Sequence, residues 1–123
     1  MPEKIKILVI DDEPSVVDAV KLILNDNGYD AVVAMTGHEG IEECEKARFD
    51  VTITDLRLPD MSGFDVLKWI RLKDPQSRVI IITSHSTPEV ILEARKGGAV
   101  DVLPKPFSPK DLIQQVDRAL ATH

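Results

Sequence analysis

Short apolar runs rich in valine and isoleucine recur five times along the chain, and each is four to six residues long. Nearly continuous runs of this length are typical of parallel strands that are covered on both faces. The segments between them show helical spacing of apolar residues, as in Val16, Val20 and Leu24. The pattern therefore predicts strand and helix in alternation, five times over. The predicted strands are Ile5–Ile10, Ala31–Met35, Val51–Thr54, Val79–Thr83 and Val100–Leu103.

The predicted helix boundaries carry their own signals. A Ser or Thr followed three residues later by Asp or Glu can satisfy the free backbone amides at a helix start. Proline at the first helical position and glycine just after the last one are further signals. Starts are predicted at Thr36/Glu39, Ser62/Asp65, Thr87-Pro88 and Ser108-Pro109 (with Asp111), and stops at Gly28 and Gly97-Gly98.

This alternation predicts an α/β fold, an open parallel sheet with right-handed crossovers and helices on both faces. We expect a doubly wound, three-layer sandwich. No internal repeat, low-complexity tract or Pro/Gly/Ser-rich linker divides the chain. Residues 1–123 are therefore expected to form one domain, with a core from about residue 4 to residue 121.

Composition and charge exclude several classes of protein. The longest apolar run, Ile7 to Ile10, is far shorter than the roughly 18 residues of a membrane span, and the N-terminus lacks a signal-peptide pattern. The single cysteine, Cys44, excludes an internal disulfide and is expected to be a small buried hydrophobe. A net charge of −6 disfavours direct nucleic-acid binding. These features predict a cytoplasmic protein without membrane contact.

Polar side chains follow four of the five predicted strands. They are Asp11 and Asp12, Asp55, Thr83 and Ser84, and Lys105. Ligands of open α/β sheets bind outside the carboxyl ends of the strands, so these side chains are expected to converge on one edge. Taken singly, each has a structural explanation: Asp11 and Asp12 as helix caps, Asp55 and Lys105 as loop residues, Thr83 as a β-branched strand residue.

Together these side chains predict phosphoryl chemistry. Crowded carboxylates repel one another unless a cation or a proton intervenes, and their oxygens suit Mg²⁺. A divalent metal neutralises charge on a transferring phosphoryl group, while a lysine and a hydroxyl hold its other oxygens. One carboxylate can itself be the nucleophile and form an aspartyl phosphate.

Four stretches closely resemble the receiver domain of two-component response regulators. They are Ile7-Leu-Val-Ile-Asp-Asp-Glu-Pro14, Asp55-Leu-Arg-Leu-Pro-Asp-Met-Ser-Gly63, Ile82-Thr83-Ser84 and Leu103-Pro-Lys-Pro-Phe107. Their order and spacing match that family over nearly the whole chain. The resemblance implies a flavodoxin-like (βα)5 fold with strand order 2-1-3-4-5. It also implies a switch in a phosphorelay rather than an enzyme.

The resemblance implies a role for each residue of the cluster. Asp55 would accept a phosphoryl group from the phosphohistidine of a sensor kinase or a histidine phosphotransfer protein. Asp12 and Asp55 would ligate Mg²⁺ directly, with Asp11 acting largely through water and Arg57 through its backbone carbonyl. Thr83 and Lys105, with Ser84, would bind phosphoryl oxygens. Output would pass through the face formed by the fourth helix, fifth strand and fifth helix to an output domain, a protein partner or a phosphorylation-dependent dimer.

Three positions bear on how such a switch would behave. Receivers usually carry an aromatic residue three positions before the lysine, where this chain has Val102. The usual coupling from Thr83 to the output face is therefore expected to differ here. Arg57 and His85 resemble the pair that flanks the path of attacking water, and we expect them to tune the lifetime of the aspartyl phosphate.

Other classes of protein share parts of this pattern. A flavodoxin-type electron carrier needs a hydroxyl- and glycine-rich loop where this chain has three acids, and the six glycines never form the G-x-G-x-x-G of dinucleotide enzymes. The main alternative is a Mg²⁺-dependent phosphatase with an aspartate nucleophile, although such enzymes resemble D-x-D at the first strand and usually carry a cap. A free-standing receiver and one attached to a longer regulator are both compatible with the sequence.

Overall fold

The computed structural model describes residues 4–121, which form one five-stranded parallel sheet in the order β2-β1-β3-β4-β5. Both the predicted doubly wound α/β fold and the strand order implied by the resemblance are confirmed. The strands are β1 (Lys6–Ile10), β2 (Asp30–Ala34), β3 (Val51–Asp55), β4 (Val79–Thr83) and β5 (Asp101–Pro104). The helices are α1 (Pro14–Asp26), α2 (Gly37–Lys46), α3 (Gly63–Lys73), α4 (Pro88–Lys96) and α5 (Pro109–Ala121).

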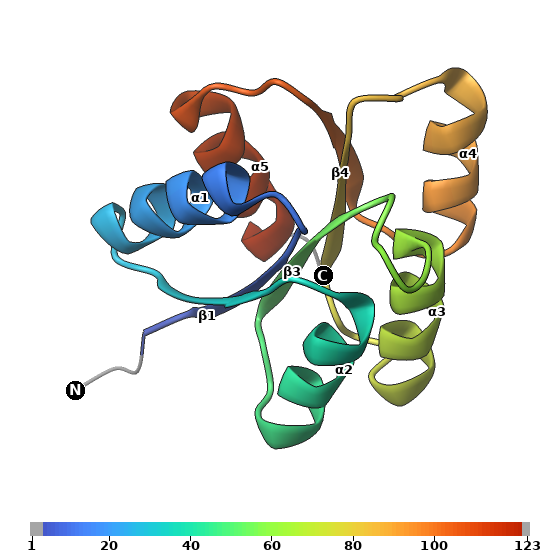
Figure 1. Cartoon of the computed structure of the whole chain (residues 1–123), viewed down its shortest axis with the longest axis horizontal. Coiled ribbons are helices and arrows are strands. Elements are labelled where there is room, and N and C mark those ends of the chain that lie inside the picture. Colours follow the sequence, from blue (N-terminus) through green and yellow to red (C-terminus); the bar gives the residue numbers. More distant parts are fainter. Residues whose placement is uncertain (1–3, 122–123) are drawn as a thin grey trace.

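The helices form two layers around the sheet. Helices α1 and α5 cover one face, and α2, α3 and α4 cover the other (Figure 1). Alternate residues of β1 supply the two cores: Ile7 and Val9 pack toward α1 and α5, whereas Leu8 and Ile10 pack toward α2 and α3. All four side chains are fully buried, which explains why this strand is a continuous apolar run in the sequence.

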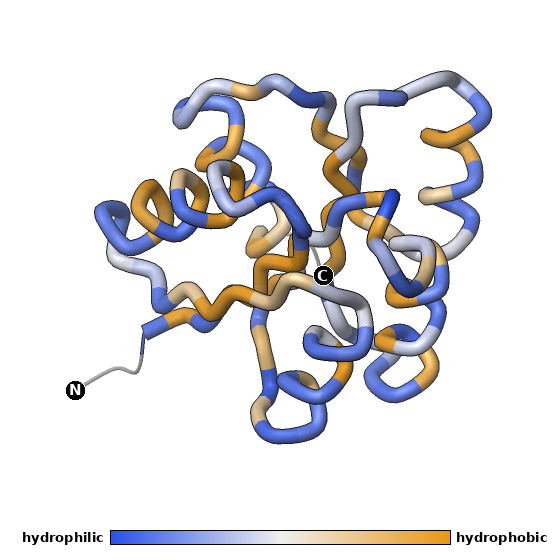
Figure 2. The backbone as a smooth tube through the Cα atoms, viewed as in Figure 1, coloured by the Kyte–Doolittle hydropathy of each residue, from blue (hydrophilic) through white to orange (hydrophobic). Residues whose placement is uncertain are grey.

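Hydropathy follows this layering along the chain. Figure 2 shows hydrophobic residues concentrated in the strands, while the helices alternate between hydrophobic and hydrophilic positions. Within residues 4–121, none of the helices is long and apolar enough to cross a membrane.

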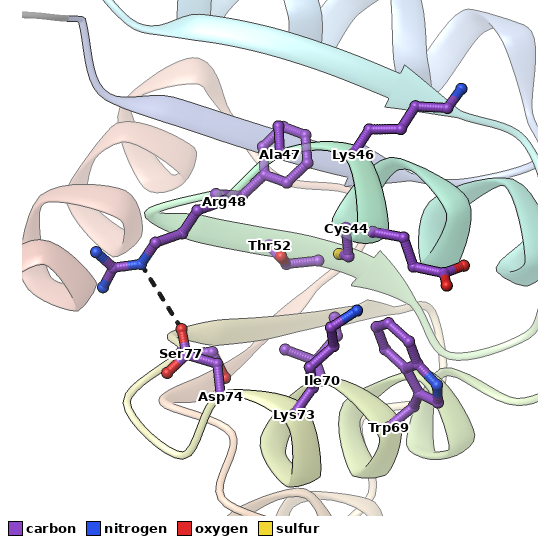
Figure 3. Close-up of a pocket in the computed structure, with 12 residues that line it drawn as sticks. Cys44, Lys46, Ala47, Arg48, Thr52, Trp69, Ile70, Lys73, Asp74 and Ser77 are labelled. Atoms are coloured by element: carbon purple, nitrogen blue, oxygen red, sulfur yellow. Dashed lines mark ion pairs between the residues drawn. The ribbon is translucent and has the colours of Figure 1, made fainter.

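Cys44 is only half-buried, beside the pocket between α2 and α3 (Figure 3), and burial is the main cause that raises the pKa of its thiol to about 11.

The predicted boundaries agree with the structure to within one residue at every strand end. Ser62 and Asp65 form a complete capping box at α3, and Ser108 and Asp111 exchange the equivalent hydrogen bonds at α5. At α2 the Thr36 hydroxyl accepts the Glu39 amide, as predicted. Local side-chain chemistry therefore determines where these helices begin.

Gly63 is the residue that lets α3 start close to the end of β3. Its amide donates to the Leu56 carbonyl at 2.7 Å. A Cβ at this position would lie 2.3 Å from the Asp55 carbonyl oxygen and 2.9 Å from the Leu56 Cα. Both of these neighbours are backbone atoms, which cannot rotate away. The absent side chain therefore allows the loop after Asp55 to fold back onto the helix.

We predict that Gly63→Ala lowers the free energy of unfolding by about 1–3 kcal/mol, because the new methyl group would displace backbone. Gly37→Ala is the matched control, since Gly37 also occupies the first position of a helix but faces only the side chain of Met61. Denaturant unfolding should show the larger loss for Gly63→Ala. Equal losses in the two variants would contradict this account.

Candidate functional site

The polar residues that follow the strands meet at one edge of the sheet, as the sequence predicts. Asp11 directly follows β1, Asp55 ends β3 and Thr83 ends β4. The register aligns Asp55 with Ile82 and Thr83 with Pro104, which immediately precedes Lys105. Parallel pairing therefore brings residues that are up to 94 positions apart into one cluster.

Lys105 lies at the centre of this cluster. Its Nζ donates to Asp11 Oδ2 at 2.7 Å and lies 3.4 Å from Asp55 Oδ2 and 3.5 Å from Glu13 Oε1. The Asp11 side chain is fully buried, and those of Lys105 and Asp55 are only 13% and 11% exposed. The lysine is thus the cation that moderates repulsion among the carboxylates.

Asp55 occupies an electrostatically unfavourable position. Burial, followed by repulsion from Asp11, raises the pKa of its carboxyl group above the ordinary value. Lys105 and the backbone N–H of Arg57 act in the opposite direction without cancelling the effect. The Asp55 carboxylate is consequently less stable in its charged form than a solvated one, and it gains from any added positive charge.

The same cluster favours the charged form of Lys105. Burial by itself would lower the pKa of this ammonium group. The hydrogen bond to Asp11, and the negative charges of Asp11, Asp55 and Glu13, outweigh burial and raise the pKa. Lys105 therefore stays protonated at neutral pH and supplies a fixed positive charge beside Asp55.

Thr83 connects the cluster to the loop between β4 and α4. Its side chain is almost completely buried, and its hydroxyl oxygen accepts the backbone N–H of His85 at 2.9 Å. Ser84 and His85 are exposed, and the Ser84 hydroxyl lies 3.2 Å from His85 Nδ1. Movement of the Thr83 hydroxyl would therefore remove a hydrogen bond that holds this loop.

The remaining predicted residues lie in different surroundings. Arg57 is exposed in the loop after β3, where its backbone pairs with Ser62. Val102 of β5 is buried and aligned with Ile81 of β4. It belongs to the same apolar cluster as Ala94 of α4, so it is a core residue that links β5 to that helix layer.

Three carboxylates at this edge could hold a metal ion. Asp11, Asp12 and Asp55 each offer an oxygen, and these oxygens lie within 4.8 Å of one another. An all-oxygen set with an exposed member, Asp12, fits a hard divalent cation that keeps several waters. The helix-cap alternative has less support, because the N-cap residue of α1 is Glu13 and its side chain makes no cap bond. Asp11 does accept the Glu13 amide at 3.0 Å.

Two acids near the site had no role in the sequence-based predictions. Glu13 is the third carboxylate beside Lys105. Asp60, in the loop after β3, accepts the amides of Gly37 and His38 at 2.8 and 2.9 Å and thereby caps α2 from a distance. Burial by itself would raise the pKa of Asp60, but these bonds and the hydrogen bond with the His38 ring together outweigh burial and lower the pKa to about 2. No local sequence signal marks this contact, because it joins residues more than 20 positions apart.

Comparison with family models identifies the kind of domain that this chain forms. The model of the response regulator receiver domain matches residues 7–117. This chain belongs to the response regulator receiver domain family. Receiver domains are signalling components of two-component systems, which accords with the cluster around Asp55.

Known relatives and structures agree with this assignment. The chain is 35% identical over 118 residues to the transcriptional regulatory protein ZraR of Salmonella typhimurium, covering 96% of this chain and 27% of that protein. It is 36% identical over 107 residues to the alginate biosynthesis transcriptional regulatory protein AlgB of Pseudomonas aeruginosa, covering 87% of this chain and 24% of that protein. The chain thus spans about a quarter of the length of these relatives. The chemotaxis response regulator CheY4 of Vibrio cholerae superposes with a TM-score of 0.90 at 34% identity, covering 96% of this receiver domain and all of that chain.

The raised pKa of Asp55 predicts how stability depends on pH. The fold favours the protonated carboxyl group of Asp55. This contribution to stability is fully present when the pH lies below the pKa that Asp55 has in the unfolded chain, and it is lost as the pH rises through the higher pKa that Asp55 has in the folded receiver. In a chelator at pH 7, Asp55→Asn should therefore raise Tm, and the difference from the wild type should narrow toward pH 4. Thermal unfolding followed by circular dichroism would measure both effects.

The stabilisation that bound Mg²⁺ gives is a second test of the same electrostatic account. At about 100 times its Kd, the ion should stabilise the wild type by roughly 2.7 kcal/mol and Asp55→Asn by less. Asp18→Asn, on the exposed surface of α1, is the control and should behave as the wild type does. A lower Tm for Asp55→Asn in chelator, or an unchanged Tm of the wild type on adding Mg²⁺, would contradict the electrostatic account.

Proposed function

We propose that this receiver domain accepts a phosphoryl group on Asp55 and that the resulting aspartyl phosphate changes the surface offered to a partner. The observation that carries the proposal is the position of the Asp55 carboxylate, half surrounded by acids and 3.4 Å from the Lys105 ammonium. Such a carboxylate is both a nucleophile and a group whose neighbours can stabilise added phosphoryl oxygens.

Each residue would contribute a separate part of the transfer. An Asp55 carboxylate oxygen attacks the phosphorus of a phosphohistidine in a sensor kinase or a histidine phosphotransfer protein. The phosphorus–nitrogen bond breaks, and its electron pair returns to the imidazole, which takes up a proton. Lys105 and Thr83 bind the transferred phosphoryl oxygens, and Ser84 offers a second hydroxyl nearby. Asp55 and Asp12, water held by Asp11, and the Arg57 carbonyl would hold Mg²⁺, which neutralises the charge of the phosphoryl oxygens.

The switch would begin at Thr83. When its hydroxyl turns toward a phosphoryl oxygen, the His85 amide loses the acceptor that it has at 2.9 Å, and the loop before α4 must rearrange. Val102 has no ring to rotate, so coupling would run through repacking of the buried cluster that contains Val102 and Ala94. The output face would be α4, β5 and α5, which an output domain, a protein partner or a second phosphorylated copy would contact. A cytoplasmic location remains a prediction from the sequence.

The decisive measurement is intact-mass spectrometry after incubation with Mg²⁺ and a small-molecule phosphodonor. We expect one added phosphoryl group on the wild type, and none on Asp55→Asn or in the presence of a chelator. The adduct should be cleaved by hydroxylamine, as an acyl phosphate is. Thermal unfolding of Asp55→Asn in parallel would show that its lack of reaction is not caused by misfolding.

Two results would contradict the proposal. A folded wild type that binds Mg²⁺ but forms no adduct would indicate a receiver that does not depend on phosphorylation. Repeated turnover of an added phosphomonoester, rather than labelling at one group per chain, would favour a phosphatase with an aspartate nucleophile. The labelling and turnover measurements use the same protein sample and differ only in the phosphorylated reagent.

Arg57 and His85 are proposed to set how long the phosphoryl group persists. Both are exposed and belong to the loops that follow β3 and β4, the strands that end in Asp55 and Thr83. Truncating either side chain should open the approach of water and shorten the half-life of phosphorylated Asp55. We would measure the loss of the phosphorylated mass with time in Arg57→Ala, His85→Ala and the control Arg95→Ala, which lies on α4. An unchanged half-life in both loop variants would show that these side chains play no part.

A further inference from the structure

A second pocket lies at the opposite edge of the sheet from Asp55. It is bounded by the turns that lead into β4 and β5 and by the end of α5, and its volume is about 670 Å³. Four arginines line it, and none of the described residues lining it is acidic. In a chain with a net charge of −6, this concentration of positive charge is unexpected. The four are Arg48, Arg71, Arg78 and Arg118.

Arg71 is held in place by the backbone. Its Nη1 donates to the Ser77 carbonyl oxygen at 3.0 Å. Its Nε lies 2.6 Å from the point where Gly98, at φ +95°, would carry a Cβ. Any other residue at position 98 would therefore push the guanidinium aside. A half-buried arginine fixed in this way loses little conformational entropy when it binds an anion.

The other arginines surround this fixed group. Arg78 is half-buried at the start of β4, whereas Arg48 and Arg118 are exposed at the rim. Figure 3 shows Arg48 reaching toward Asp74, with 3.7 Å between Nε and the carboxylate oxygen. Arg118 lies 4.0 Å from Asp101. The two carboxylates screen part of the positive charge at the rim, but neither of them lines the pocket.

A polar side chain at the wall of the pocket lacks a partner. Ser77 lies between this pocket and the one between α2 and α3 and lines both, and its hydroxyl oxygen is buried without a hydrogen-bond partner among residues 4–121. Buried polar atoms are almost always hydrogen-bonded, because an unpaired one costs free energy. The backbone carbonyl of the same residue accepts from Arg71 Nη1, so a turn of the Ser77 side chain into the pocket would add a hydroxyl donor to a set that suits a multiply charged oxyanion.

We infer that this pocket binds a pyrophosphoryl group. Guanidinium groups recognise phosphate oxygens through paired N–H donors, and several of them can share two adjacent phosphoryl units. Pro75 and Val100 line the same pocket and offer apolar contact to an uncharged part of the ligand. The group could belong to free pyrophosphate or to a nucleoside diphosphate. The inference does not depend on phosphorylation of Asp55.

Titration of the full chain with sodium pyrophosphate, without divalent metal, tests this inference. Calorimetry would give the Kd, and amide chemical shifts would locate the site. We expect saturable shifts at residues 76–78 and 98–100. Arg71→Gln should weaken binding at least about tenfold through loss of charged hydrogen bonds. Arg95→Gln, an exposed arginine of α4 outside the pocket, is the matched control and should bind as the wild type does.

Further variants keep the test informative if Arg71→Gln unfolds. Arg78→Gln should also weaken binding, and Arg71→Lys should restore only part of the affinity, since lysine lacks the paired donors. Tighter binding of adenosine diphosphate than of pyrophosphate would identify a nucleotide as the source, whereas equal affinity would identify free pyrophosphate. Absence of saturable binding in the low-millimolar range would overturn the inference. So would shifts confined to residues 55–57 and 83–85, or an affinity unaffected by both the Arg71 and Arg78 substitutions.

Discussion

The contact between Lys105 and Asp11 underlies the arrangement of the whole carboxyl edge. A fully buried carboxylate without a partner costs several kcal/mol, and Lys105 supplies that partner at 2.7 Å. The two residues come from opposite ends of the chain, so the pair forms only when β1, β3, β4 and β5 are all in register. The site therefore requires the completed sheet.

One lysine does not balance the acids around it. Asp11, Glu13 and Asp55 all lie within 3.5 Å of its Nζ, and Asp12 adds a further carboxylate to the group. The edge thus retains unfavourable electrostatic energy that any bound cation would relieve. Crowded ionisable groups of this kind concentrate at functional sites in proteins, because neutralising them would add stability at the expense of activity.

The success of sequence reasoning depended on how far apart the interacting residues lie. Strand ends and the Ser62 cap depend on neighbours a few residues away, and the sequence predicted them correctly. The meeting of Asp55 and Lys105 followed from topology, since parallel strands bring their carboxyl ends together. The cap that Asp60 provides for α2 could not be predicted, because it depends on the path of a loop in space. The same holds for Arg71 packed over Gly98, because this contact joins α3 to the turn after α4, and no sequence pattern links the two.

The two edges of the sheet differ in the sign of their charge. Carboxylates gather where the strands end, and arginines gather where β4 and β5 begin. The molecule therefore carries a permanent dipole moment along the strand direction, in addition to its net charge. In the field of a charged partner this dipole exerts a torque, so that a cationic surface meets the acidic edge first during diffusion. Raising the ionic strength would weaken this orientation before it disturbed any contact within the fold.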